Sequence, residues 1–152
     1  MFKKVSLVVI VAFILGGCAS VPMKSVKESN QAKQFKPPSN GKAGLYIYRD
    51  SFVGAALKKD VWVDGRCIGE TASDIFFYEE VIGDKEHTVS TESEFSPNDL
   101  MLETKKDRNY FIRQYIKFGL FVGGAGLELV DTEKGKKAVS KLELAKKGTC
   151  SK

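Results

Sequence analysis

The dipeptide Asp64-Gly65, set between two apolar arms, narrows the folds open to this chain more than any other feature. Asp-Gly is favoured at the centre of a type I′ turn, which needs positive φ at both residues and joins two antiparallel strands. The turn places Trp62 opposite Cys67 and Val61 opposite Ile68, so Trp62 and Cys67 share one face. An isolated hairpin is marginal in water, so this one requires further strands.

Short β-branched and aromatic segments recur along the chain, separated by polar turns about eight to twelve residues apart. That spacing predicts a mainly β fold, a small antiparallel sandwich or barrel. The expected strands are 45–49, 60–69, 75–78, 87–91, 100–103, 109–118 and 125–130.

The pattern changes near the end of the chain. Ala138, Leu142 and Ala145 lie on one helical face, which predicts a short C-terminal helix over 135–147 capped by Gly148. Residues 141–144 also alternate as a strand would. We therefore expect a β-sandwich domain with a C-terminal helix over 42–147 and a tail over 148–152.

The first 17 residues have the pattern of an export signal. Two lysines precede an apolar run over residues 5–15, which is too short for a helix of about 20 residues that crosses a bilayer. The run ends in Leu15, Gly16, Gly17 and Cys18, which resembles the bacterial lipobox. The small residues fit a signal peptidase, so residues 1–17 are predicted to be a lipoprotein signal peptide.

The lipobox implies a lipid anchor on Cys18. Its thiol would take a diacylglycerol and its freed amino group an acyl chain, which together exceed the threshold for stable anchoring. Ala19, rather than aspartate, follows the cysteine. In a bacterium with two membranes this implies the outer membrane, with the protein on its inner leaflet facing the periplasm.

Residues 18–41 are predicted to hold the lipidated cysteine and a flexible tether. They lack a sustained apolar period and contain Pro37-Pro38. A coil of about 23 residues would have a root-mean-square span of roughly 25–30 Å, which would let the domain stand off the membrane.

The motifs, taken in order, resemble a bacterial family. Phe35-Lys36-Pro37-Pro38 ends the linker, residues 41–49 read Gly-Lys-Ala-Gly-Leu-Tyr-Ile-Tyr-Arg, and the hairpin and a turn over 83–87 follow. This order resembles the uncharacterised lipoproteins that carry domain of unknown function 2846. That family is similar to the PEGA type of module, which implies an Ig-like β-sandwich outside the cytoplasm and no known catalytic residues.

Few residues suggest chemistry. The single histidine, His87, follows a charged turn, where we expect it to bond to the backbone rather than act as a base. We expect no catalytic residues, metal or cofactor, and no nucleic-acid partner. The protein is predicted not to be an enzyme.

Cys67 and Cys150 remain once Cys18 carries lipid. An oxidising compartment permits a disulfide between them. The alternative is a thiol of Cys67 packed on Trp62 and an unbonded Cys150, and a regular hairpin favours this second reading.

Leu120, Phe121 and Val122 precede a glycine-rich turn. A strand cannot direct three consecutive side chains to one face, so this loop is a candidate interaction site for a membrane or another protein.

Together these features favour a non-catalytic, membrane-anchored envelope lipoprotein that serves as a structural or protein-interaction module, with an envelope protein as its partner. The alternative is a small periplasmic inhibitor or ligand-binding lipoprotein of the lysozyme-inhibitor type, which usually relies on a disulfide. A bond between Cys67 and Cys150 would favour that alternative.

Overall fold

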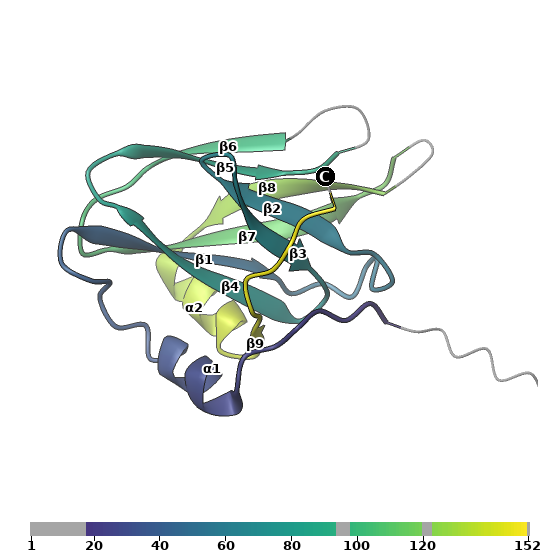
Figure 1. Cartoon of the computed structure of the whole chain (residues 1–152), viewed down its shortest axis with the longest axis horizontal. Helices are drawn as coiled ribbons and strands as arrows, with labels where there is room; N and C mark the ends of the chain where they lie inside the picture. Colours follow the sequence, from purple (N-terminus) through teal and green to yellow (C-terminus); the bar gives the residue numbers. More distant parts are fainter. Residues whose placement is uncertain (1–17, 94–97, 120–122, 152) are drawn as a thin grey trace, which may run out of the picture.

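Two β-sheets face each other in the computed structural model, which describes residues 18–93, 98–119 and 123–151 (Figure 1). One sheet has five strands in the order β8-β7-β1-β4-β9, and the other has four in the order β3-β2-β5-β6. The strands are β1 (Lys42–Arg49), β2 (Lys59–Val63), β3 (Arg66–Thr71), β4 (Ile75–Ile82), β5 (Glu86–Thr91), β6 (Asn98–Glu103), β7 (Asn109–Lys117), β8 (Gly124–Val130) and β9 (Glu143–Leu144). The prediction of a mainly β, two-sheet fold is confirmed.

The predicted hairpin is the β2–β3 turn. Asp64 and Gly65 have φ of 51° and 75°, as a type I′ turn requires. Trp62 pairs with Cys67 as expected, but Val61 pairs with Gly69, so Ile68 is the extra residue of a β-bulge. The predicted pairing of Val61 with Ile68 was wrong for that reason.

Strand β1 is buried on both of its faces. Ala43, Leu45 and Ile47 point into the core between the two sheets. Tyr46 and Tyr48 belong to a second core on the outer face of the five-stranded sheet. The alternation of aliphatic and aromatic residues along this strand therefore reflects two separate apolar environments.

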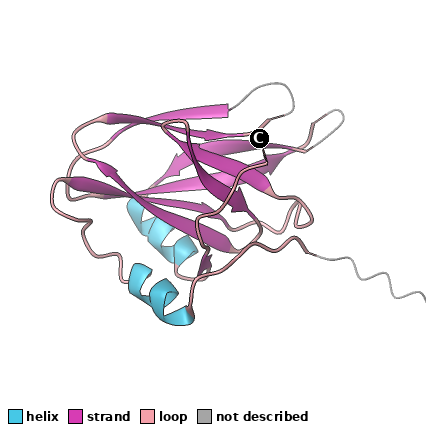
Figure 2. Ribbon diagram, in the orientation of Figure 1, coloured by secondary structure: helices cyan, strands magenta, loops and turns pink. Residues whose placement is uncertain are grey.

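Two helices cover that outer face and add a third layer (Figure 2). Helix α1 spans Val26–Ala32 and helix α2 spans Thr132–Val139. The Tyr46 hydroxyl donates to the Ala32 carbonyl at the end of α1, 2.9 Å away. Burial raises the pKa of Tyr46 to about 12, so this hydroxyl stays a donor at neutral pH.

Helix α1 lies in the segment that was expected to be a flexible tether, so that prediction was wrong. Ser25 caps the helix, and Glu28 completes a capping box by accepting from the Ser25 backbone. Hydrogen bonds from Lys24 and Ser25 lower the pKa of Glu28 to about 2. Beyond the helix, the Phe35 ring packs edge-on against Tyr46, 5.3 Å between centroids.

The sequence predicts an antiparallel sandwich, but two strand pairs in the structure are parallel. Strand β7 pairs in parallel with β1, and β9 pairs in parallel with β4. Parallel neighbours need long crossovers. The connection from β1 to β7 contains the four-stranded sheet and β4, and helix α2 lies within the connection from β4 to β9.

The C-terminal helix is present but shorter than the predicted 135–147. It ends at Val139 with Ser140 as its C-cap, so Gly148 is not the cap. Residues 143–144 form β9 instead, in the stretch whose alternation also suited a strand. Docking on the open edge of β4 outweighs the high intrinsic helix propensity of the Leu, Glu, Ala and Lys residues in this stretch.

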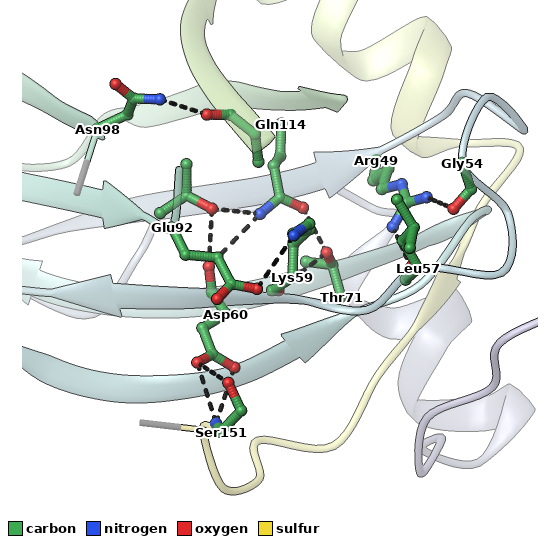
Figure 3. Close-up of polar contacts among 12 residues, drawn as sticks. Arg49, Gly54, Leu57, Lys59, Asp60, Thr71, Glu92, Asn98, Gln114 and Ser151 are labelled. Atoms are coloured by element: carbon green, nitrogen blue, oxygen red, sulfur yellow. Dashed lines mark hydrogen bonds and ion pairs between the residues drawn. The ribbon is translucent and has the colours of Figure 1, made fainter. Parts of the chain in front are cut away.

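A polar bridge crosses the apolar core. Gln114 on β7 is fully buried, and its amide donates to Thr91 Oγ1 of the other sheet, 2.7 Å away. Thr91 in turn donates to the Asp60 carbonyl at 2.8 Å, and Thr71 Oγ1 donates to the Gln114 side-chain oxygen (Figure 3). Each group that is taken from water therefore finds a partner, which fixes one register between the sheets.

Helix α2 packs closely on β7 at Gly135. A Cβ added there would lie 2.3 Å from Cβ of Phe111, which is itself fully buried. Alanine favours a helix by about 1 kcal/mol over glycine, whereas overpacking typically costs about 1–3 kcal/mol. We expect Gly135→Ala to lower the melting temperature in spite of its better helix propensity, as measured by circular dichroism. A raised melting temperature would contradict the close packing of α2 on Phe111.

Candidate functional site

Cys18 is exposed at the start of the described chain, and the fold begins directly after it. The Ala19 N–H donates to the Ala55 carbonyl in the β1–β2 loop, 2.9 Å away. An acyl chain on the Cys18 nitrogen would leave this bond intact, because the donor belongs to the next residue. The candidate attachment point is thus held against the folded body.

The segment after Cys18 pairs with the C-terminal part of the chain. Met23 forms an antiparallel bridge with Ala145. The Lys24 N–H donates to the Leu144 carbonyl, and the Lys146 N–H donates to the Pro22 carbonyl, both at 2.9 Å. Residues 22–24 therefore extend the β4–β9 edge instead of leaving it open.

Residues 143–151 continue from the five-stranded sheet to the four-stranded sheet. Ala145 N–H donates to the Phe76 carbonyl on β4, and Gly148 N–H donates to the Ile68 carbonyl on β3, each at 2.9 Å. Ile68 is the bulged residue, and its carbonyl bonds to this segment instead of to β2. The bulge and the docked C-terminal segment therefore meet at this carbonyl.

A disulfide joins Cys67 to Cys150, with 6.0 Å between their Cα atoms. The preference for two unbonded thiols is therefore not what the structure shows. The regular hairpin around Cys67 does not prevent the bond, because the docking of residues 145–148 brings Cys150 alongside β3. That docking joins residues 83 positions apart and leaves no local pattern in the sequence.

Two buried carboxylates hold the same segment. Asp60 is fully buried, and both of its oxygens lie 3.0 Å from the Ser151 N–H. Glu79 on β4 is almost fully buried and forms ion pairs with Arg66 and Lys147. Sequence analysis did not single out either carboxylate, because nothing near them in the sequence marks them as buried.

His87 is 3% exposed and bonds on both sides of its ring. Its Nε2 lies 2.7 Å from the Ile82 carbonyl, the backbone contact that was expected, and its Nδ1 lies 2.6 Å from Asp64. A carbonyl and a carboxylate are both acceptors, so each ring nitrogen of His87 faces an acceptor. Burial tends to raise the pKa of Asp64, but hydrogen bonds from His87 and Thr88 outweigh it and leave the pKa below its usual value.

A surface hollow of about 490 Å³ lies between α1 and the C-terminal segment. Two of the cations that line it are engaged, Lys24 with Glu28 and Lys147 with Glu79. No group of three or more metal-ligating side chains occurs within the described ranges. No helix among the described residues is long and apolar enough to span a bilayer.

Several predicted residues lie outside the described part of the chain. They are Leu15, Gly16 and Gly17 of the lipobox and Leu120, Phe121 and Val122 of the candidate loop.

The geometry defines a class of protein: a two-sheet β domain with helices on one outer face and both terminal segments bound to its edges. Residues 39–125 match the family described as a protein of unknown function (DUF2846), and the chain belongs to that family. An uncharacterized protein of Haemophilus influenzae is 62% identical over 135 residues, which cover 89% of this chain and 80% of the relative. No solved structure matches the present chain significantly.

The disulfide closes a loop of 83 residues, so its removal should be costly. The loss of a native disulfide from a small exported domain costs about 2–5 kcal/mol, chiefly because the unfolded chain gains freedom. We expect Cys67→Ser/Cys150→Ser to lower the free energy of unfolding in urea by that amount, and a reducing agent to have the same effect on the wild type. Unchanged unfolding in both experiments would contradict the bond.

The Asp64 contacts predict a pH dependence. Because the pKa of Asp64 is lowered by folding, its contribution is complete above about pH 4 and is lost as the pH falls through the folded value. Asp64→Asn should therefore lower the melting temperature at pH 6 and have a smaller effect near pH 2.5. Asp99→Asn, at an exposed position on β6, serves as the control. An Asp64→Asn effect that is equal at both pH values would argue against the pair with His87.

Proposed function

We propose that this protein is a non-catalytic lipoprotein of the bacterial cell envelope, held on a membrane through acyl chains on Cys18. The observation that carries the proposal is the position of Cys18: it ends a lipobox and stands exposed where the fold begins. A thioether-linked diacylglycerol and an amide-linked acyl chain together make the attachment stable. Ala19 in the following position favours the inner leaflet of the outer membrane, facing the periplasm.

The disulfide supports the same compartment. Disulfides form and persist in oxidising environments such as the periplasm, and are rare in the bacterial cytosol. Cys67 and Cys150 are bonded in a regular part of the fold, which suits a protein that folds after export.

We propose that the domain acts as an Ig-like, PEGA-like structural or protein-interaction module with an envelope protein as its partner. Its two-sheet fold supports this proposal, as do its terminal segments, which leave the edges of β4 and β3 covered. Edges covered in this way are not available to pair with strands of a neighbouring molecule.

The disulfide also favours a second candidate, a small periplasmic inhibitor or ligand-binding lipoprotein. Inhibitors of the lysozyme type usually rely on such a bond. Purified protein should be assayed against lysozyme with intact and reduced disulfide. Inhibition that is lost on reduction would favour this candidate over the interaction module.

The anchor is tested by Cys18→Ser in cells fed a labelled fatty acid. We expect the wild type to carry the label and sediment with membranes, and the variant to carry none and leave the membrane fraction. Cys67→Ser/Cys150→Ser is the matched control, since it changes cysteines but should keep the label. A Cys18→Ser protein that is still labelled would refute the proposal.

A further inference from the structure

Two loops form one end of the molecule. Leu57 in the β1–β2 loop packs against Gly54 and against Gly123, which precedes β8. A Cβ atom placed on these glycines would lie 3.3 Å and 2.9 Å from the Leu57 side chain. Ile116 near the end of β7 packs against the same two glycines. The β1–β2 loop, residues 50–58, is therefore joined by apolar contacts to the ends of β7 and β8.

Cys18 lies at this same end. The bond from Ala19 to Ala55 places the cysteine directly beside the β1–β2 loop. Figure 1 shows the described chain beginning at the right of the view, where the β1–β2 loop and the β7–β8 connection also lie. Cys18, the candidate attachment point, thus lies at this end of the fold.

Large apolar side chains project from this end without cover. Phe52 is 80% exposed and Phe118 is 90% exposed, and Val53 is exposed beside Phe52. Phenylalanine is among the residues most often buried, and two such rings left in water at one tip need an explanation. We call Phe52, Val53 and Phe118 the apolar tip.

The loop that carries Phe52 and Val53 is held in a defined shape. Arg49 is fully buried, and its guanidinium donates to the carbonyls of Leu57 at 2.7 Å and Gly54 at 2.5 Å (Figure 3). Burial lowers the pKa of Arg49, which is consistent with a guanidinium taken from water to serve these carbonyls. The loop therefore presents its apolar residues from a rigid base.

The charges around the tip suit an anionic surface. Lys117, next to Phe118, and Lys58, at the end of the β1–β2 loop, are both exposed. The Lys58 ammonium forms a long ion pair with Glu70, at 4.0 Å, and an exposed pair of this kind contributes little energy. The nearby carboxylate of Asp50 is already paired with Arg113 at 2.7 Å. Exposed lysines close to a bilayer are attracted to anionic headgroups.

We propose that the apolar tip is a membrane-contact face, in which Phe52, Val53 and Phe118 enter the headgroup region of an anionic bilayer beside the acylated Cys18. This inference rests on the proposed anchor at Cys18. The bilayer is the occupant because the anchor leaves the fold at this face and no tether separates the two. The domain then sits on the membrane in one orientation instead of swinging on a linker.

Single tryptophans that report contact with lipid can test this orientation. In a Trp62→Phe background, Phe52→Trp and Phe118→Trp place the probe at the tip. Ile82→Trp is the matched control, because Ile82 is 56% exposed at the far end of β4, opposite the start of β1. The full-length lipoprotein is purified from membranes and reconstituted into phosphatidylethanolamine–phosphatidylglycerol vesicles with or without brominated acyl chains.

We expect bromine to quench the probes at positions 52 and 118 at least threefold more than the probe at 82. Two results would overturn the membrane-contact face but leave the anchor intact, provided that the protein floats with the vesicles. In one, the probe at position 82 is quenched as strongly as the probes at the tip; in the other, no probe is quenched. Protein whose Cys18 carries no acyl mass and that does not float overturns the anchor, and with it this inference.

Discussion

One extended segment, residues 143–151, joins the two sheets along one side of the sandwich, and much else depends on it. It pairs with β4 at its start, bonds to the bulged Ile68 in its middle and reaches the disulfide and the buried Asp60 at its end. The contacts support one another, since the bulge in β3 supplies the carbonyl and the bound segment brings Cys150 to Cys67. A single small domain has a limited core, so such a link contributes a large share of its stability.

The five-stranded sheet depends on both of its faces being covered. Aliphatic residues of β1 face the other sheet, and Tyr46 and Tyr48 face the helices. Helix α1 has only seven residues, and a helix of that length is not stable alone in water. It therefore depends on its packing against this sheet. Its capping box and the ring of Phe35 are therefore parts of the fold, although they belong to a segment whose composition is that of a linker.

The strands and the central hairpin could be predicted because their signals are local: alternation, β-branched residues and the Asp64-Gly65 turn. The parallel pairing of β1 with β7, the strand β9 and the disulfide depend on contacts between residues far apart, which no local pattern encodes. Likewise, polarity marked residues 18–41 as linker, since a short capped helix buries few side chains. At the candidate site, Cys18 was found from its motif, whereas exposure alone revealed Phe52 and Phe118. The family match over residues 39–125 leaves out Cys150 and both terminal segments, so the contact between those segments lies beyond it.

The pairing of the two terminal segments also determines how the molecule carries mechanical load. A pull on Cys18 acts first on the bond from Ala19 to the Ala55 carbonyl, and then on the backbone bonds of residues 22–24 to residues 144–146. From there the tension divides, passing into the five-stranded sheet through β9 and into the four-stranded sheet through the covalent link from Cys150 to Cys67. Force applied at the chain's exposed cysteine is thus shared by both layers of the sandwich for as long as the backbone bonds of residues 22–24 hold, and the branch into the four-stranded sheet includes a covalent link.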